Sequence, residues 1–232
     1  YPITRDCLKA GKHVLLEKPI AMELWEADEL ITLARRGRLK FTIGYSQRFN
    51  PKFAYAKKKI TDGTLGKIVS VMVSRHLSRG LGTKIAKRVK LSPVVMESTH
   101  DLDFVFWLLE PAKPVRVYSQ GAYGYMQPIN GSYDTHRDVW LNTVSEGTRF
   151  PMSTMPGEQV DHVFAGQMGP ETIHFLESCI MDRPVMVTPE SARMVMETYT
   201  AADLSAERNE PVELPLSNAA LSAVAEMVGG KR

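Results

Sequence analysis

The tripeptide Glu17-Lys18-Pro19 is the segment of this sequence best suited to chemistry. It directly follows the apolar run Val14-Leu15-Leu16, which predicts a buried strand, so an ammonium and a carboxylate stand at the strand's carboxyl end. Ligands bind at this edge of open parallel α/β sheets, because strand carboxyl ends and helix amino ends converge there. A lysine at such an edge can donate a hydrogen bond or a proton. The alternative is a surface turn, since all three residue types are common on surfaces.

His100 is the second candidate, because imidazole titrates near neutral pH and therefore suits proton transfer. On a helix, Glu97 would lie three residues before His100 and Asp103 three residues after it. Residues three apart on a helix share a face, so we expect the three side chains to lie together. A carboxylate beside an imidazole fixes its tautomer and raises its basicity. The alternative is a histidine at a helix start whose acidic neighbours are simply solvated.

Other classes of site find little support in the sequence. The remaining histidines and the two cysteines, Cys7 and Cys179, lack the spacing of a metal site or a C-x-x-C pair, so we predict no metal. A net charge of +3 on 232 residues does not call for nucleic acid. No apolar stretch approaches the roughly 18 residues of a membrane span. With 44% hydrophobic and 24% charged residues, the sequence indicates a globular protein, for which a cytoplasmic location is the default.

The elements that would position these residues form two groups. Residues 2–11 predict a short helix, 12–16 a strand, 22–36 a helix that Gly37 ends, and 40–45 a second strand. This order predicts part of a doubly wound α/β sheet in residues 1–48. Residues 49–232 predict an α+β domain. Its expected helices lie near residues 53–60, 171–181 and 191–206, and its expected strands cover residues 67–74 and 115–119.

Four segments in this order resemble the glucose-fructose oxidoreductase and inositol dehydrogenase family of nicotinamide-dependent enzymes. They are residues 10–21, which contain Glu-Lys-Pro, residues 44–51, residues 97–109, and residues 187–216. Residues 97–109 resemble the family's helix that brings a histidine to the substrate, and residues 187–216 resemble its C-terminal helix and its closing strand, which covers 211–216. The resemblance implies the C-terminal part of a Rossmann domain, followed by an open, mostly antiparallel sheet domain with helices on one face. It also implies NAD or NADP as cofactor, a sugar, cyclitol or related polyhydroxylated substrate, and a homo-oligomer, either a dimer or a tetramer.

The same resemblance assigns roles to individual residues. Lys18 would donate to the reacting oxygen and orient the nicotinamide, and His100 would exchange a proton with the substrate hydroxyl, with Glu97 as the third catalytic residue. The residues that would bind the cofactor are Glu17, Lys18, Pro19, Tyr45 and Arg48, and those that would bind the substrate are Lys18, His100 and Asp103. Tyr45 and Arg48 fit equally well with strand-end packing and a salt-bridged surface arginine.

Two departures from the family pattern leave alternatives open. Many members have an aspartate four residues before the histidine, where this chain has Met96, so either Glu97 substitutes for it or the proton relay is weaker. The family's N-terminal G-x-G-x-x-G turn has no counterpart in this sequence, because the nearest glycine pair, Gly80 and Gly82, fits a loop. An internal sheet segment near Asp134 is also expected to be absent. The expected activity is hydride transfer between a nicotinamide cofactor and a polyhydroxylated substrate. The alternative is a noncatalytic scaffold, or a small-molecule binding or assembly domain.

Overall fold

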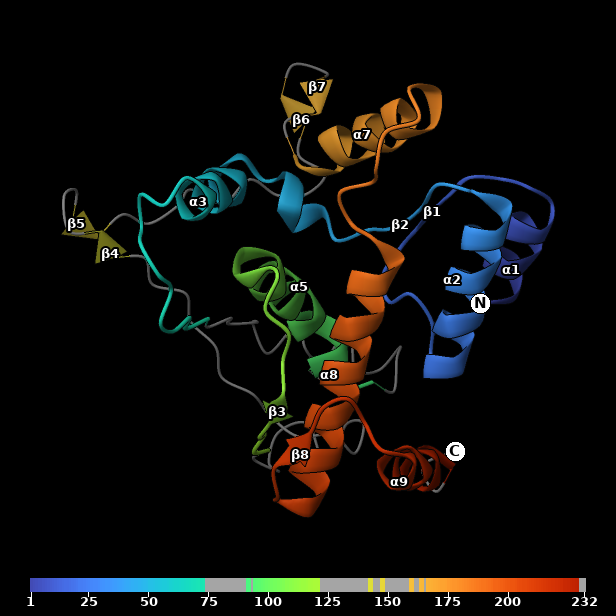
Figure 1. The fold of residues 1–232 in the computed structure, drawn as a ribbon, viewed down its shortest axis with the longest axis vertical. Coiled ribbons are helices and arrows are strands. Elements are labelled where there is room, and N and C mark those ends of the chain that lie inside the picture. The colour runs from blue at the N-terminus through green and yellow to red at the C-terminus, as the bar shows by residue number, and fades with distance from the viewer. Residues whose placement is uncertain are drawn as a thin grey trace. The chain divides into compact units, whose positions relative to one another are not determined.

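The computed structural model describes residues 1–73, 91–92, 94–121 and 166–229, together with four two-residue strands between positions 142 and 164 (Figure 1). The chain divides into two compact units. The first unit consists of Tyr1–Val69, Asp103–Glu110 and Pro151–Met196, and the second of Ser70–Leu102, Pro111–Phe150 and Glu197–Arg232. Both units are therefore built from segments that lie far apart in the sequence.

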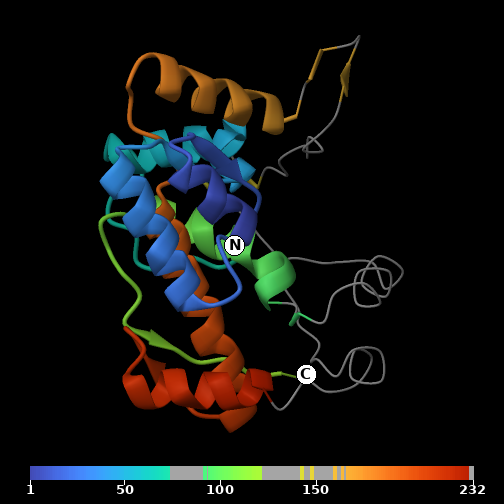
Figure 2. The same ribbon diagram turned by 90° about the vertical axis from the view of Figure 1, so that its right-hand side faces the viewer.

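The first unit opens with a β-α-β arrangement. Helix α1 (Pro2–Lys9) and strand β1 (Val14–Leu16) are followed by helix α2 (Leu24–Gly37) and strand β2 (Phe41–Ile43). The two strands pair in parallel, with Leu15 opposite Thr42, and β2 is buried along its whole length. Helices α1 and α2 lie side by side in both views (Figures 1 and 2). The β-α-β order predicted for this region is confirmed.

Helix α2 begins and ends through local interactions. Glu23 and Glu26 form a capping box, in which each side chain accepts a hydrogen bond from the other residue's backbone N–H. The predicted end at Gly37 is wrong by one residue, because Gly37 is still helical and Arg38 takes the left-handed conformation at φ 51°. A Cβ at position 37 would lie 3.0 Å from the Leu39 side chain, which would have to shift slightly to make room for it.

The rest of the first unit is mainly helical. The 3-10 helix η1 (Ser46–Phe49) leads into α3 (Pro51–Thr61), which Asn50 caps by accepting a hydrogen bond from the Lys52 N–H at 3.1 Å. Helix α7 (Met168–Ile180) packs on η1. Residues of helix α5 (Thr99–Leu109) that belong to this unit form an apolar cluster with two α3 residues, made of Phe104, Trp107, Leu108, Phe53 and Ile60. The helices predicted near 53–60 and 171–181 are confirmed.

The second unit contains a π-helical segment, η2 (Val94–Ser98), and the start of α5. Strand β3 (Arg116–Val117) pairs antiparallel with β8 (Val212–Glu213), while helices α8 (Pro189–Arg208) and α9 (Asn218–Gly229) flank β8 in sequence. The Ser119 N–H donates to Ser205 Oγ at 3.0 Å, and this hydroxyl donates to the Glu210 carbonyl at 2.6 Å. These bonds tie the segment after β3 to the end of α8.

One predicted element is wrong and others stay predictions. Residues 67–73 form no strand; Val69 and Met72 are 92% and 77% exposed, and no described strand pairs with them to satisfy their backbone. Among the described residues, strands occur only as four two-stranded pairs, the other two being β4–β5 (Asn142–Thr143, Gly147–Thr148) and β6–β7 (Gln159–Val160, Val163–Phe164). The open antiparallel sheet and the domain boundary at 48/49 stay predictions. The expectations for Gly80, Gly82 and Asp134 lie outside the described residues.

Candidate functional site

The Glu17-Lys18-Pro19 turn directly follows β1, at the carboxyl end of the parallel pair. The Gly44 N–H donates to the Leu16 carbonyl at 2.7 Å, so the segment after β2 runs beside the turn. A Cβ at Gly44 would lie 3.1 Å from Glu17 Oε2, and the absence of a side chain therefore lets the Glu17 carboxylate lie against this backbone. Lys18 is half-buried, and the Lys18–Pro19 peptide bond is cis. A cation is thus held at the predicted edge of the sheet.

The two cofactor candidates that follow β2 are buried instead. Tyr45 and Arg48 are 1% and 2% exposed. Arg48 Nε donates to Asp103 Oδ2 at 2.9 Å, and its Nη2 donates to Asp103 Oδ1 at 2.6 Å. This bidentate pair has almost no access to solvent, because the Asp103 side chain is fully buried. Burial raises the pKa of the Asp103 carboxyl, and the hydrogen bonds from Arg48 oppose that rise.

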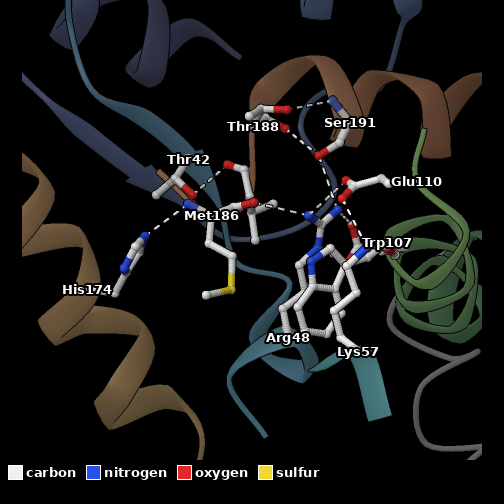
Figure 3. Close-up of polar contacts among 11 residues, drawn as sticks. Thr42, Arg48, Lys57, Trp107, Glu110, His174, Met186, Thr188 and Ser191 are labelled. Carbon is white, nitrogen blue, oxygen red and sulfur yellow. Dashed lines mark hydrogen bonds and ion pairs between the residues drawn. The ribbon is translucent and has the colours of Figure 1, made fainter. Parts of the chain in front are cut away.

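Arg48 also joins other segments of the first unit (Figure 3). Its Nη1 donates to the Met186 carbonyl at 3.0 Å, and its Nη2 donates to Ser191 Oγ at 3.2 Å. The guanidinium lies 5.8 Å from the centre of the Trp107 ring, and Glu110 Oε1 is 3.8 Å from Nη1. The hydrogen-bond donors of Arg48 are therefore directed at the protein itself. Its proposed contact with a cofactor stays a prediction.

Glu171, in the first turn of α7, was not identified from the sequence. Its side chain is 5% exposed, and its Oε1 has no hydrogen-bond partner among the described residues. Burial raises the pKa of Glu171 to about 7, and repulsion from the Glu17 and Asp103 carboxylates adds to that rise. The one available signal was periodicity: Glu171 lies seven residues before the buried Ser178, on the same face of the helix.

Glu97 and His100 belong to the second unit, whereas Lys18 belongs to the first. Both are half-buried, and His100 is the second residue of α5. The expectation that Glu97 shares an α-helical face with His100 and Asp103 needs correction, because Glu97 lies in the π-helical segment η2. A π-helical turn bonds residue i to i+5, so the α-helical spacing does not apply there. The catalytic and substrate-binding roles of these residues stay predictions.

Neither a metal site nor a membrane-spanning helix occurs within the described ranges. There, no three or more His, Cys, Asp or Glu side chains come together in a way that would hold a metal ion. The helices of the same ranges include none that combines the length and the apolar character of a membrane span.

Among known proteins, residues 1–45 match the family model GFO_IDH_MocA, an oxidoreductase family with an NAD-binding Rossmann fold. An inositol 2-dehydrogenase/D-chiro-inositol 3-dehydrogenase of Lactiplantibacillus plantarum is 28% identical over 147 residues, which are 62% of this chain and 40% of that protein. A myo-inositol dehydrogenase of Streptomyces leeuwenhoekii is 32% identical over 117 residues, which are 50% of this chain and 35% of that protein. The chain spans less than half the length of these curated relatives.

Solved structures show the same likeness in fold. A putative myo-inositol dehydrogenase from Sinorhizobium meliloti has a TM-score of 0.73 at 19% identity, covering 92% of this chain and 77% of that one. A scyllo-inositol dehydrogenase from Lactobacillus casei, with bound NAD(H) and scyllo-inositol, has a TM-score of 0.71 at 20% identity and covers 90% and 75%. The family resemblance predicted from the sequence is confirmed for its first part: residues 1–45 match the model of this oxidoreductase family with an NAD-binding Rossmann fold.

Proposed function

We propose that this chain serves an NAD- or NADP-dependent dehydrogenase that transfers a hydride between the nicotinamide and a CH–OH group of a sugar, cyclitol or related polyhydroxylated substrate. The observation that carries the proposal is the half-buried Lys18 in the turn after β1, within the segment that matches the NAD-binding family model. The inositol dehydrogenases among the relatives support a polyhydroxylated substrate. By resemblance, the proposal includes a cytoplasmic location and a homo-oligomer.

The residues present fit the nicotinamide end of such a cofactor. The strand edge carries a cation at Lys18, and Gly44 beside it has no side chain that would cover its backbone. The proposal concerns this end of the cofactor, which would lie at the carboxyl edge of the parallel strands. Glu17 and Pro19 would contact the cofactor at its nicotinamide end. Tyr45 and Arg48 are buried, and Arg48 is bonded to Asp103.

The chemistry asks two things of the protein's own groups. When bound, the cofactor supplies the hydride transfer. Lys18 would hold a positive charge and a hydrogen-bond donor at the reacting oxygen, which stabilises negative charge as it develops there. His100 would accept the hydroxyl proton, and Glu97 would orient its imidazole. Asp103 would act through its ion pair with Arg48, which fastens α5 to η1 within the first unit.

The proposal is tested by fluorescence titration of the purified protein with NADH and NADPH, after its intact mass has been measured. We expect saturable binding, weakened in Lys18→Met and unchanged in Lys9→Met, which alters an exposed lysine of α1. Inositols and sugars are then screened with the cofactor that binds. A folded protein that binds neither cofactor would reject the dehydrogenase.

The second candidate function is a noncatalytic scaffold or a small-molecule binding or assembly domain. The burial of Arg48 favours it, because the guanidinium of this expected cofactor ligand bonds to Asp103 and to the Met186 carbonyl. The same titration separates the two candidates. A scaffold would bind a polyol with neither cofactor present, and its affinity for the polyol would not change when NADH is added.

A further inference from the structure

Gln167 occupies the capping position before helix α7, but its side chain does not cap the helix. Ser, Thr, Asp and Asn are preferred at such positions, because their short side chains accept hydrogen bonds from the first N–H groups of the helix. The Gln167 side chain accepts no such bond within α7, a helix that the structure describes from end to end. The residue is nevertheless only 2% exposed. Helix capping therefore does not explain this buried amide.

The Gln167 amide instead bridges the two ends of the 3-10 helix η1. Its Nε2 donates to Ser46 Oγ at 3.3 Å, and its Oε1 accepts a hydrogen bond from Asn50 Nδ2 at 3.1 Å. Ser46 is the first residue of η1, and Asn50 directly follows the last one. Both are buried, so water has little access to replace these bonds. Removing the bridge would leave buried polar groups without their partners, which costs more than losing a solvated hydrogen bond.

The direction of these hydrogen bonds is set by a backbone group. The Lys52 N–H can only donate, and it donates to Asn50 Oδ1 at 3.1 Å. The other end of the Asn50 amide is therefore its NH₂ group, which donates to Gln167 Oε1. The Gln167 NH₂ group is then left to donate to Ser46. Glutamine suits this position, because its amide offers one acceptor and one donor group in a single plane.

Ser46 connects this bridge to the carboxyl edge of the parallel strands. It lies two residues after Gly44, whose N–H donates to the Leu16 carbonyl at 2.7 Å. Gly44 also lies against the turn after β1, since a Cβ there would be 3.1 Å from Glu17 Oε2. The segment from Gly44 to Ser46 is therefore held at both ends, by β1 through Gly44 and by Gln167 through Ser46.

We propose that Gln167 is a positioning residue for this strand edge: through its hydrogen bond to Ser46, it holds Gly44 beside the Glu17-Lys18-Pro19 turn. The proposal rests on the proposed function, in which the nicotinamide end of the cofactor lies at this edge. Gln167 acts through Ser46 and is not itself a catalytic residue. Without the bridge, the segment at Gly44 gains freedom and has to be ordered each time a cofactor binds, which weakens binding.

The effect on Gly44 is measured by hydrogen exchange of its amide, followed by NMR. Gln167→Met keeps an unbranched side chain of similar length and removes both hydrogen bonds. We expect the Gly44 N–H to exchange about fivefold faster in this variant, relative to the Leu30 N–H, because one buried hydrogen bond contributes on this scale. Leu30 is a fully buried residue of α2, and its amide corrects for any change in global stability.

Two further variants separate positioning from a general loss of stability. Ser46→Ala removes only the Ser46 bond, so we expect the same change at Gly44 and no further change when it is combined with Gln167→Met. Ser178→Ala is the matched control, because Ser178 is a buried residue of α7 whose hydroxyl donates to the His174 carbonyl at 2.8 Å. It should leave the Gly44 exchange ratio unchanged. If Gln167→Met does not fold, Ser46→Ala still decides.

The effect on the proposed site is measured by fluorescence titration with NADH. We expect the dissociation constant to rise about fivefold in Gln167→Met and in Ser46→Ala, and to match the wild type in Ser178→Ala. A variant that is only less stable keeps its dissociation constant as long as nearly all of it is folded. A raised dissociation constant in the folded variants therefore indicates positioning, and not stability.

The outcomes separate this proposal from the proposed function. An unchanged Gly44 exchange ratio would overturn the positioning role of Gln167, even if NADH binds. A raised ratio with an unchanged dissociation constant for NADH would also overturn it, because the bridge would then not serve the cofactor. A raised ratio in a protein that binds neither NADH nor NADPH would support the positioning of Gly44 and reject the dehydrogenase. A raised ratio together with weaker NADH binding would support both.

Discussion

The two neighbouring strands β1 and β2 end side by side, yet the charged residues that follow them have different environments. After β1, Glu17 is exposed and Lys18 is half-buried. After β2, Arg48 is buried and pairs with a fully buried aspartate. A strand's carboxyl edge is therefore not enough to make a charged residue available to a ligand. Its availability depends on whether other segments of the unit supply hydrogen-bond partners. For Arg48 these partners come from α5, from the residues before α8, and from the first turn of α8.

The largest effect is expected from Lys18, the accessible member of this comparison. Lys18→Met should lower kcat/KM by about 10²- to 10⁴-fold, because a positioned proton donor contributes on this scale. The urea midpoint should change little, since half-exposed side chains contribute modestly to stability. Lys9→Met is the control for loss of an exposed lysine. If Lys18→Met lost much stability but kept full activity, Lys18 would have the structural role that we assign to Arg48.

Arg48 should show the opposite behaviour. Arg48→Met leaves Asp103 as a buried carboxylate without its partner, so we expect the free energy of unfolding to fall by about 3 to 5 kcal/mol in urea titrations. Arg35→Met removes the exposed ion pair with Glu190 and should cost about 1 kcal/mol or less. Equal costs for the two variants would show that burial does not distinguish these arginines.

The pH dependence of the free energy of unfolding tests the buried carboxyl group of Glu171. The pKa of Glu171 is raised from 4.5 to about 7, so the folded protein retains a proton that the unfolded chain releases first. The resulting stabilisation is complete below pH 4.5 and is lost as the pH rises through about 7, amounting to at most about 3 kcal/mol. Urea midpoints between pH 4 and 8 should therefore fall less in Glu171→Gln than in the wild type. Parallel curves would contradict this prediction.

The smallest effect concerns the close approach between the two strand ends. Gly44→Ala introduces a Cβ 3.1 Å from Glu17 Oε2, and we expect a cost of about 1 kcal/mol. Glu17→Ala in the same chain removes the contact, so the double variant should be more stable than the sum of the two single changes predicts. Strict additivity, measured by urea denaturation, would mean that the two residues do not touch.

Local interactions account for the elements that the sequence predicted well. The β-α-β order follows from two short apolar runs and one amphipathic stretch, and the capping box of α2 joins residues only three apart. The expected strand over residues 67–74 failed because a strand needs a partner that its own sequence does not specify. Glu97 was misplaced for a similar reason, since nothing in the local pattern distinguishes a π-helical turn from an α-helical one.

The sequence by itself determined the family resemblance, the turn that carries Lys18 at the end of β1, and the helices with clear apolar stripes, because these depend on residues close together in the chain. Only the tertiary structure decided that Arg48 is a buried anchor and that Glu171 is a buried acid. Asp103, which pairs with Arg48, lies 55 positions away from it, and Glu17, which repels ionised Glu171, lies 154 positions away from Glu171. Burial and charge pairing arise from such distant contacts, and a residue's own neighbourhood in the sequence does not contain them.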